Sequence, residues 1–277
     1  MAKTNVGQTD NAAKYVLVTG AYGGMGRATT DILAAQGYRV FAMDIHVDET
    51  DCRPNVIPVQ ADITDYDSVL AAAEKVAETT DNLHAVVHFA GVYMLDSLVE
   101  MSVGDFRRIV DINLYGAFVV NKVFVPFLRR GGRVVITTSE LAPLDPLPFT
   151  GIYAVTKAAL DKYAYSLCME LQLSGISVSV IRAGAVSTGM LGTSTAALDR
   201  FVSETTRYKC NAEHFKQVVD SVEAKAVPPQ KIGEKAAKIL SARKPKFVYN
   251  VNRNGLLLLL NALPKRMQLW AIRRVLK

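Results

Sequence analysis

A tyrosine and a lysine four residues apart are the side chains of this 277-residue sequence best suited to acid–base chemistry. Tyr153 and Lys157 stand in the stretch Gly-Ile-Tyr-Ala-Val-Thr-Lys, and on a helix this spacing places both on one face. A phenol titrates near pH 10, which is too high for efficient acid–base catalysis at neutral pH. A neighbouring ammonium stabilises the phenolate and lowers the phenol pKa. The pair is therefore expected to exchange a proton with an alcohol or a ketone.

Polar residues upstream could complete such a site. Ser139 ends an apolar run and could hold the substrate oxygen, although Thr138 competes for this role if the following turn is shifted. Asn113 lies within an otherwise apolar predicted helix that should bury it. A buried amide needs hydrogen-bond partners, so Asn113 is either a satisfied structural group or the anchor of a water in a proton relay.

The first apolar run of the chain leads into a glycine-rich turn. Residues 15–27 read Tyr-Val-Leu-Val-Thr-Gly-Ala-Tyr-Gly-Gly-Met-Gly-Arg, which predicts a strand, a loop and a helix. The candidate binding residues of this loop are Gly20, Tyr22, Gly24, Met25 and Gly26. Glycines let backbone amides approach a pyrophosphate, and the helix N-terminus adds partial positive charge. In this context the loop predicts a dinucleotide site.

Two aspartates at predicted strand ends bear on which dinucleotide binds. Asp44 ends the second strand, and neither lysine nor arginine directly follows it. A carboxylate there accepts hydrogen bonds from the ribose diol of NAD and repels the 2′-phosphate of NADP, so NAD is the expected cofactor. Asp62, which precedes Ile63, either meets the adenine amino group or begins a turn.

Short apolar runs alternate with helical stretches along most of the chain, which is typical of βαβ units around a buried parallel sheet. Strands are predicted at 15–19, 39–43, 56–60, 85–89, 133–137, 176–181 and 246–250, and helices near 25–36, 67–78, 104–128 and 151–173. Residues 189–229 break this rhythm and are expected to cover the carboxyl edge of the sheet. The predicted organisation is a flexible tail (1–14), one dinucleotide-binding and catalytic domain (15–250) with that insertion, and a basic amphipathic segment (251–277).

These features together resemble the short-chain dehydrogenase/reductase family. The shared motifs are Thr19-Gly20-x3-Gly24-x-Gly26, Asp62, Ala90-Gly91, Asn113, Ser139 and Tyr153-x3-Lys157. The resemblance extends to about Asn250 and implies an α/β fold, a single Rossmann-type doubly wound parallel sheet with helices on both faces and a helical substrate-covering insertion. The family's usual Asn-Asn-Ala-Gly is here His88-Phe89-Ala90-Gly91. His88 is expected to be a packed strand residue rather than a catalytic base.

The resemblance also implies a role for each member of an Asn-Ser-Tyr-Lys tetrad. Tyr153 is the acid/base, and Lys157 binds the nicotinamide ribose and tunes the tyrosine. Ser139 orients the reacting oxygen, and Asn113 fixes a water in the relay. Further cofactor contacts are expected from Ile63, Ala90, Gly91, Val186 and Thr188, the last of them to the nicotinamide carboxamide.

Composition and charge exclude several function classes. With 50% hydrophobic and 21% charged residues the chain is neither disordered nor collagen-like. Cysteines 52, 168 and 210 lie far apart and the histidines show no ligand spacing, so no disulfide framework and no metal are expected. The net charge of +6 first suggests a nucleic acid partner, but 11 basic and no acidic residues follow Glu234. The basicity belongs to the tail, and no nucleic acid is expected.

The expected function is an oxidoreductase that transfers a hydride between NAD and a secondary alcohol or ketone. A bulky apolar substrate is suggested by apolar insertion residues, namely Met190, Leu191, Leu198, Phe201, Tyr208, Phe215 and Val218. Resemblance to the hydroxysteroid and retinol dehydrogenase branch favours a steroid or bile-acid alcohol. One alternative is a nucleotide-sugar epimerase or dehydratase of the family's extended branch. The glycine pattern of that branch also matches the loop through Gly23 and Gly26, although the chain is short for this branch. The other is a non-catalytic NAD-binding sensor, which would not need the complete tetrad.

The basic C-terminal segment allows two interpretations. Its leucines 256–260, Trp270 and late cations suit an amphipathic helix on an anionic membrane, or a helix packed over the substrate entrance or a neighbouring subunit. The leucine run is too short to span a bilayer, and no secretory signal is recognised, so a cytoplasmic protein is expected. The family resemblance implies a homodimer or homotetramer through helices 104–128 and 151–173.

Overall fold

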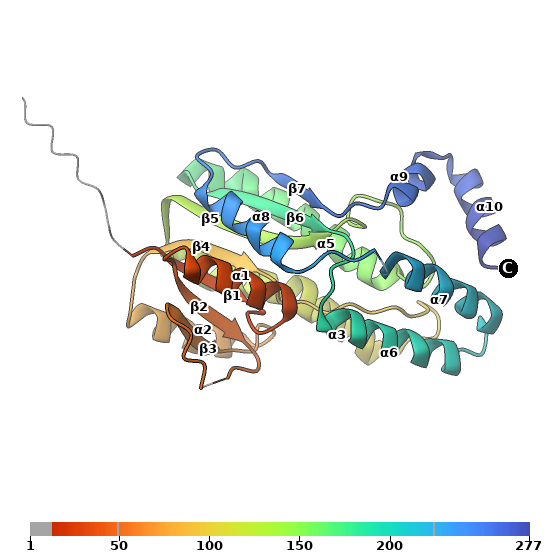
Figure 1. The fold of residues 1–277 in the computed structure, drawn as a ribbon, viewed down its shortest axis with the longest axis horizontal. Coiled ribbons are helices and arrows are strands. Elements are labelled where there is room, and N and C mark those ends of the chain that lie inside the picture. Colours follow the sequence, from red (N-terminus) through yellow and green to blue (C-terminus); the bar gives the residue numbers. More distant parts are fainter. Residues whose placement is uncertain (1–12, 49, 224) are drawn as a thin grey trace, which may run out of the picture.

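A seven-stranded parallel sheet lies at the centre of the molecule (Figure 1). The computed structural model describes residues 13–277 except 49 and 224, and it does not describe the side chains of residues 190–196 and 223. The strands are β1 (Tyr15–Thr19), β2 (Arg39–Asp44), β3 (Val56–Gln60), β4 (Leu83–His88), β5 (Leu128–Ser139), β6 (Ser177–Ala183) and β7 (Val248–Val251). Their order is β3-β2-β1-β4-β5-β6-β7, which confirms the predicted doubly wound α/β fold. The chain changes direction across the sheet between β1 and β4, where a crevice forms at the carboxyl ends.

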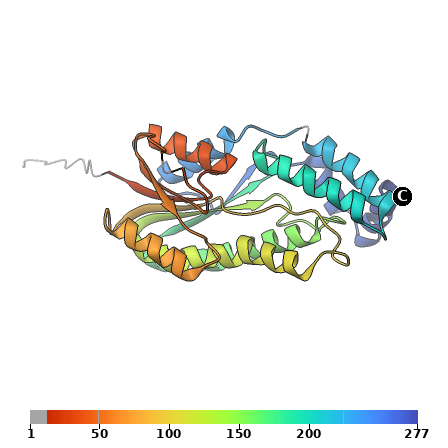
Figure 2. The ribbon, with the colours of Figure 1, turned by 90° about the horizontal axis from the view of Figure 1, so that it is seen from below.

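Helices cover both faces of this sheet (Figure 2). The helices are α1 (Gly24–Ala35), α2 (Tyr66–Ala77), α3 (Val103–Val110), α4 (Gly116–Phe124), α5 (Gly151–Leu171), α6 (Gly189–Glu204), α7 (Lys209–Glu223), α8 (Gln230–Ser241), α9 (Gly255–Ala262) and α10 (Lys265–Val275). Helices α1 and α8 pack on one face, and α2, α4 and α5 pack on the other. The sequence analysis did not predict α8, although its buried residues Ile232, Ala236 and Ile239 follow helical spacing directly after Pro228-Pro229.

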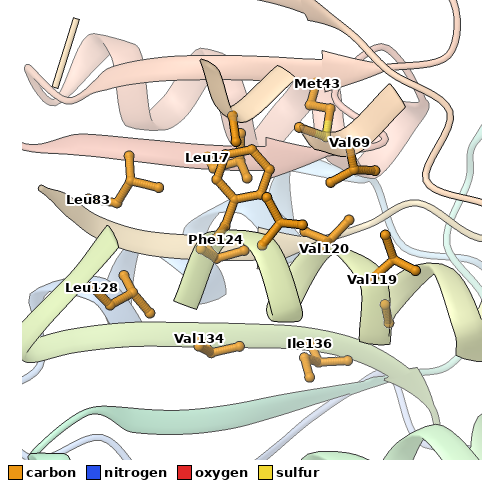
Figure 3. Close-up of a cluster of buried hydrophobic side chains, with 14 of the residues drawn as sticks. Leu17, Met43, Val69, Leu83, Val119, Val120, Phe124, Leu128, Val134 and Ile136 are labelled. Carbon is orange, nitrogen blue, oxygen red and sulfur yellow. The ribbon is translucent and has the colours of Figure 1, made fainter. Parts of the chain in front are cut away.

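The larger core lies between the sheet and helices α2, α4 and α5 (Figure 3). Phe124 of α4 is fully buried and meets Leu17 of β1 and Val120 of its own helix in this cluster. The central strands β1 and β4 are buried on both faces, which is why they read as continuous apolar runs rather than as alternating ones.

The segment predicted as one helix over 104–128 is a composite. Helix α3 is followed by a π-helical turn at Asp111–Tyr115, then by α4 and a short 3₁₀ turn at Val125–Phe127. By length and composition alone, the segment Val103–Phe127 could also cross a membrane. Half of its most apolar 18-residue stretch is, however, buried inside the protein. That burial is typical of a helix that packs against a protein core.

Two helical units lie beyond the sheet at the end of the molecule remote from β3 (Figure 1). The insertion forms the antiparallel pair α6 and α7, and the C-terminal segment forms α9 and α10. A separate apolar cluster joins Leu198 and Phe201 of α6 to Phe215 of α7, and Leu276 at the end of α10 belongs to it. Val251 closes β7, and within the predicted segment 251–277 the first helix begins at Gly255. Most of the predicted N-terminal tail, residues 1–12, lies outside the described residues, as do the side chains of Met190 and Leu191.

Candidate active site

The glycine-rich loop occupies the crevice between β1 and β4. Gly20 has a φ of +64°, and a Cβ on it would lie 2.6 Å from the backbone nitrogen of Ala90. A Cβ on Gly26 would lie 1.9 Å from the Gly20 carbonyl oxygen, and one on Gly24 would lie 2.6 Å from Cγ2 of Thr188. No side chain fits at these three positions. The backbone therefore stays open at the start of α1, as a pyrophosphate site requires.

Asp44 stands at the end of β2, beside the glycine-rich loop. Its Oδ2 accepts a hydrogen bond of 3.0 Å from the backbone N–H of Tyr22, so the carboxylate and the loop are fixed to each other. The Tyr22 hydroxyl donates to Asp51, and Arg53 lies over the Tyr22 ring at 5.7 Å from its centroid. Arg53 is itself paired with Asp31 and Asp51.

Asp62 takes part in a turn, one of the two roles considered for it. Its Oδ1 accepts from both the backbone N–H and the hydroxyl of Thr64, at 2.8 and 2.7 Å. The next residue, Ile63, packs against Gly116 of α4, where a Cβ would lie 2.6 Å from the isoleucine Cδ1. These contacts fix the connection between β3 and α2 beside the predicted adenine site, and they leave the adenine contact of Asp62 as a prediction.

Three members of the predicted tetrad meet where β5 ends against α5. Ser139 is the last residue of β5 and is buried. Its Oγ accepts from the backbone N–H of Leu141 at 3.2 Å, and its hydroxyl lies beside the phenol of Tyr153 and acts to lower the phenol pKa. Lys157 is buried one turn further along α5, with its Nζ 5.9 Å from the Tyr153 ring centroid. The Lys157 ammonium donates to the backbone carbonyl of Thr137 at 3.2 Å. The alternative hydroxyl of Thr138 is committed to Asp161 at 3.2 Å, which assigns the interaction with Tyr153 to Ser139.

The pKa of Tyr153 differs from the sequence-based expectation. Burial raises it to about 12; the hydrogen bond from Ser139 opposes this rise, and the nearby Glu140 carboxylate adds to it. Burial lowers the pKa of Lys157 to about 8. Desolvation therefore dominates both pKa values in the free protein, and the expected lowering of the phenol pKa by the ammonium is not observed.

Asn113 lies in the π-helical turn and is almost fully buried. Its Oδ1 accepts from the backbone N–H of Val92 at 2.8 Å, and its Nδ2 donates to the Val92 carbonyl and to Thr156. A Cβ on Gly91 would lie 3.1 Å from this Oδ1 and 3.4 Å from Lys157 Nζ. The amide is therefore satisfied and fixes the loop after β4, close to the lysine. A π turn at such a position is a common feature of functional sites.

His88 is a packed residue, as predicted. It ends β4 and is 5% exposed, and its Nε2 lies 3.1 Å from the Asn121 amide oxygen. Burial lowers the pKa of His88 to about 4, so it is neutral at physiological pH. The residue contributes to the core rather than to proton transfer.

One cavity joins the catalytic residues to the cofactor crevice and to the insertion. Its cofactor end contains Met25, Gly91, Val186 and Thr188, and its reactive centre contains Ser139, Tyr153 and Lys157. The remaining wall is mainly apolar and comes from segments far apart in sequence, namely Tyr93, Leu141, Leu147, Phe215, Val218, Val219, Val222 and Leu257. Such a site suits a substrate that presents one polar group to Tyr153 and an apolar body to the remaining wall.

The sequence analysis missed several residues of this site. Glu140 follows Ser139, is 7% exposed, and its Oε2 accepts from the backbone N–H of Asn254 at 2.6 Å, just before α9. Tyr93 meets the Tyr153 ring edge-on, with centroids 4.5 Å apart. Glu140 could have been noticed as a charge next to the serine, whereas Tyr93 and Leu257 carry no local signal because the chain folds back to bring them there.

No metal centre is found among the described residues, which contain no group of three histidine, cysteine, aspartate or glutamate side chains suited to an ion. The observed donors instead fit a nicotinamide dinucleotide. Gly20, Gly24 and Gly26 form a backbone cradle without side chains, which fits a pyrophosphate, and the Lys157 ammonium faces the same cavity.

Comparison with known families agrees with this geometry. The sequence profile of the family described as short chain dehydrogenase matches residues 14–199, which include the glycine-rich loop and all four tetrad residues. The chain belongs to the short-chain dehydrogenase family. It is therefore an oxidoreductase that binds a nicotinamide cofactor and acts on a small-molecule substrate.

Individual relatives in this family differ in what their names say of cofactor and substrate. The chain is 31% identical over 194 residues to NADPH-dependent 1-acyldihydroxyacetone phosphate reductase of Schizosaccharomyces pombe, covering 67% of this chain and 66% of that protein. It is 32% identical over 191 residues to estradiol 17-beta-dehydrogenase 2 of Mus musculus, covering 65% of this chain and 50% of the relative. A short-chain dehydrogenase structure from Streptomyces avermitilis superposes with a TM-score of 0.75 at 19% identity, over 96% of this chain and 95% of that one, which shows the fold.

Proposed function

We propose that this protein is an NAD-dependent dehydrogenase and ketoreductase for a secondary alcohol on a bulky apolar molecule, with a steroid or bile-acid alcohol as the favoured substrate. The observation that carries the proposal is the cavity in which Ser139 and Tyr153 face apolar side chains of α7 and α9. A polar substrate such as a sugar would leave its hydroxyl groups without partners against this wall.

The proposed chemistry assigns a distinct task to each side chain. A nicotinamide dinucleotide held by the glycine-rich loop and Lys157 would supply the hydride acceptor for oxidation of the alcohol carbon and the hydride donor for reduction of the ketone. Ser139 donates a hydrogen bond to the substrate oxygen and fixes its position. Tyr153 removes the hydroxyl proton during oxidation and returns it during reduction. Lys157 holds its ammonium beside the phenol and the predicted ribose position, while Asn113 maintains the loop at Gly91 that faces this ammonium.

NAD is favoured over NADP by the charges around Asp44. The carboxylate is held at the end of β2 by the Tyr22 N–H, where it would repel a 2′-phosphate. The guanidinium of Arg53 is close to Tyr22 but already pairs with two carboxylates, so a phosphate would have to compete with both. The relative named as NADPH-dependent makes a direct comparison of the two dinucleotides essential.

The α6–α7 insertion supplies apolar wall residues that would contact a bulky substrate. Phe149, in the loop before α5, packs against Phe201, Tyr208 and Phe215 with ring centroids 4.8 to 5.4 Å apart. This aromatic contact holds the α6–α7 pair over the cavity, where Phe215 and Val218 form part of the wall. The resemblance to a dehydrogenase named for estradiol supports a rigid polycyclic substrate.

Steady-state rates with a panel of hydroxysteroids, retinol and short-chain alcohols, each with NAD and NADP, test substrate and cofactor together. We expect NAD-linked activity with at least one steroid alcohol and a lower kcat/KM with short polar alcohols. NAD-linked turnover confined to sugars or small alcohols would contradict the proposed substrate. Tightly bound NAD with no net redox turnover would instead favour the epimerase interpretation.

The mechanism is tested separately by Tyr153→Phe. The variant should lose on the order of 10²–10⁴-fold in kcat because only the proton-transferring hydroxyl is removed. NAD affinity, measured by quenching of protein fluorescence, should stay near the wild-type value. Turnover at the wild-type rate would contradict this mechanism and favour a site without acid–base chemistry.

We further propose a cytoplasmic homodimer or homotetramer. Large apolar side chains are exposed along α3, α4 and α5, including Phe106, Phe118 and Met169, which are 46%, 46% and 51% exposed. An exposed apolar surface on the helices of one sheet face is suited to contact with another copy.

A further inference from the structure

The C-terminal helix α10 has one face that is firmly attached to the protein. Gln268, Ile272 and Leu276 follow each other at a spacing of four residues, and Gln268 and Leu276 are 6% and 8% exposed. Ile272 and Leu276 join the apolar cluster of the insertion. The Asn211 side chain of α7 donates to the Leu276 carbonyl, and Gln268 donates to the carbonyls of Asn261 and Leu263. The orientation of α10 is therefore fixed.

The opposite face of α10 combines one tryptophan with three arginines. Arg266, Trp270, Arg273 and Arg274 are spaced by four, three and one residues, so they lie on one side of the helix. Trp270 is 70% exposed, and all three arginines are exposed. Met267 and Leu269, beside this face, are 51% and 69% exposed. A large indole ring is thus held in solvent among cationic side chains.

Helix α9 extends the apolar part of this surface. Leu256 and Leu259 are 72% and 65% exposed, whereas Leu257 on the inner side lines the substrate cavity. Figure 1 shows α9 and α10 together at the end of the molecule that also carries α6 and α7. Leucines open to the surroundings are therefore separated from the catalytic cavity by the thickness of one helix.

The charge of this region has a single sign. The chain contains 11 lysine and arginine residues after Glu234 and no aspartate or glutamate there, while the preceding part has an excess of acidic residues. Lys265 is paired with Asp145, whereas none of the three arginines of the outward face has a carboxylate within 4.0 Å among the described residues. Leucine, tryptophan and arginine on one surface match the acyl, interfacial and headgroup layers of an anionic bilayer.

We propose that the outward face of α9 and α10, formed by Leu256, Leu259, Arg266, Trp270, Arg273 and Arg274, docks on an anionic lipid membrane. Cationic side chains bind the headgroups, while Trp270 and the leucines enter the interface. A second copy of this chain is disfavoured because two such faces would bring like charges together. If the substrate is the apolar alcohol proposed above, this orientation places the wall containing Leu257 next to the lipid from which the substrate would come. The docking itself does not depend on that substrate.

The chain offers a built-in probe, since Trp270 is its only tryptophan. Full-length protein is mixed with phosphatidylcholine vesicles, with or without phosphatidylglycerol, and both flotation and tryptophan emission are recorded. We expect flotation and a blue-shifted emission with anionic vesicles, weakened by salt, and quenching by lipids brominated near the headgroup. Absence of both responses, or equal binding to neutral vesicles, would overturn the proposed electrostatic docking.

Charge variants locate the surface. The triple variant Arg266→Gln, Arg273→Gln, Arg274→Gln should bind anionic vesicles at least tenfold more weakly, because each cation near such a surface contributes roughly fivefold. The matched control Arg243→Gln, Lys244→Gln, Lys246→Gln removes the same charge at the opposite end of β7 and should bind like the wild type. Equal losses in both triples would show general attraction of the basic tail and overturn the assigned face.

Two further readouts separate other outcomes. Turnover of a water-soluble alcohol in the absence of vesicles should be unchanged in both triple variants, which verifies that they fold. Light scattering without lipid distinguishes a contact between copies. A concentration-dependent blue shift that accompanies an increase in mass, and that Leu256→Glu combined with Leu259→Glu abolishes, would assign this face to self-association instead of lipid.

Discussion

At the scale of single residues, burial controls the protonation of Tyr153 and Lys157, the two groups proposed to act in proton transfer. It raises the pKa of Tyr153 to about 12 and lowers that of Lys157 to about 8, in each case by disfavouring the charged form. The two groups are therefore held in an apolar setting that reduces stability but concentrates the effect of each charge on its neighbour. This trade-off is common in active sites.

The first prediction concerns the stability cost of Lys157. The pKa of Lys157 is lowered from 10.5 to about 8, so burying the charged amine disfavours folding. Lys157→Met should therefore stabilise the free protein at pH 7. The expected gain is roughly 2–3 kcal/mol once the lost hydrogen bond to the Thr137 carbonyl is subtracted. The gain should be complete below pH 8 and disappear as pH rises toward 10.5, because wild-type Lys157 loses its proton in the folded state first. Urea denaturation across this range measures it.

Turnover of the same variant is the control. Lys157→Met should be nearly inactive while it is more stable, because the ammonium beside the phenol and ribose is lost. A variant that is destabilised at neutral pH, or whose stability difference does not change with pH, would contradict the assignment of a buried, charged lysine.

The second prediction concerns Glu140, whose carboxylate raises the pKa of Tyr153 and whose own pKa is raised by burial. Glu140→Gln keeps an oxygen that can accept from the Asn254 N–H but removes the charge. Oxidation requires the deprotonated phenol, so kcat/KM for the alcohol rises with pH and this rise should occur at lower pH in the variant. Glu140 is thus a positioning residue that acts through Tyr153.

A matched measurement separates this effect from structural damage. The reverse ketone reduction, which uses the protonated phenol, should keep its kcat at neutral pH in Glu140→Gln. At neutral pH the free energy of unfolding of Glu140→Gln should exceed that of the wild type, because the wild-type carboxylate is charged and buried. In acid the two proteins should be equally stable, because the wild-type carboxyl is then protonated in both the folded and the unfolded state. An unchanged pH profile would remove Glu140 from the proton-transfer chemistry.

At the scale of elements, helix irregularities and a cover determine which groups reach the cavity. The π-helical turn at Asp111–Tyr115 inserts into the helix predicted over 104–128 and directs the Asn113 amide to the loop after β4. Phe149 of the β5–α5 connection contacts Phe201 of α6 and Phe215 of α7, so aromatic contacts help to hold the α6–α7 pair in place. Substrate selection should therefore respond to changes in this pair.

The third prediction concerns Phe215 of α7. The side chain is 3% exposed and contributes both to the insertion cluster and to the cavity wall. Phe215→Ala should raise the KM for a bulky apolar alcohol on the order of tenfold through lost apolar contact, while kcat/KM for a short alcohol stays near wild type. Initial rates with both substrates measure the difference. Phe127→Ala, at the amino end of β5, provides a control that should affect stability without altering this ratio.

At the scale of the whole molecule, exposed apolar side chains of the described residues include two groups on helices that cover the sheet or extend beyond it. One is the α9–α10 face described above, and the other spans α3, α4 and α5. On the second surface Phe118 and Met169 are 46% and 51% exposed, and Tyr165 is 53% exposed. Such area would be unfavourable in an isolated monomer, so a contact between copies is expected there.

The fourth prediction tests this contact. Phe118→Glu combined with Met169→Glu should convert a dimer or tetramer to a species of lower mass, because buried carboxylates at an interface cost more than the interface gains. Size-exclusion chromatography with light scattering measures the mass. Leu256→Glu combined with Leu259→Glu, on the lipid-facing surface, should leave it unchanged. If the protein is monomeric before substitution, the proposal of an oligomer is wrong.

Local sequence determined the fold class and most of the reactive centre. Alternating apolar and helical segments specified parallel strands, and the glycine pattern and the Tyr-x3-Lys spacing specified their chemistry because each depends on residues that are neighbours along one element. Helix α8 was not predicted although its apolar residues follow helical spacing. The π turn could not be predicted because a single inserted residue leaves no periodic signal.

Tertiary structure alone decided what surrounds that centre. The apolar wall brings Tyr93, Phe215 and Leu257 together from three distant segments, and no local pattern encodes such a meeting. It also set the Tyr153 pKa, since the desolvation that raises it arises from the packed environment rather than from sequence spacing. The C-terminal segment shows the same division: the sequence supplied its cations and leucines, but only packing turned Leu257 inward and Trp270 outward, because burial depends on the whole fold.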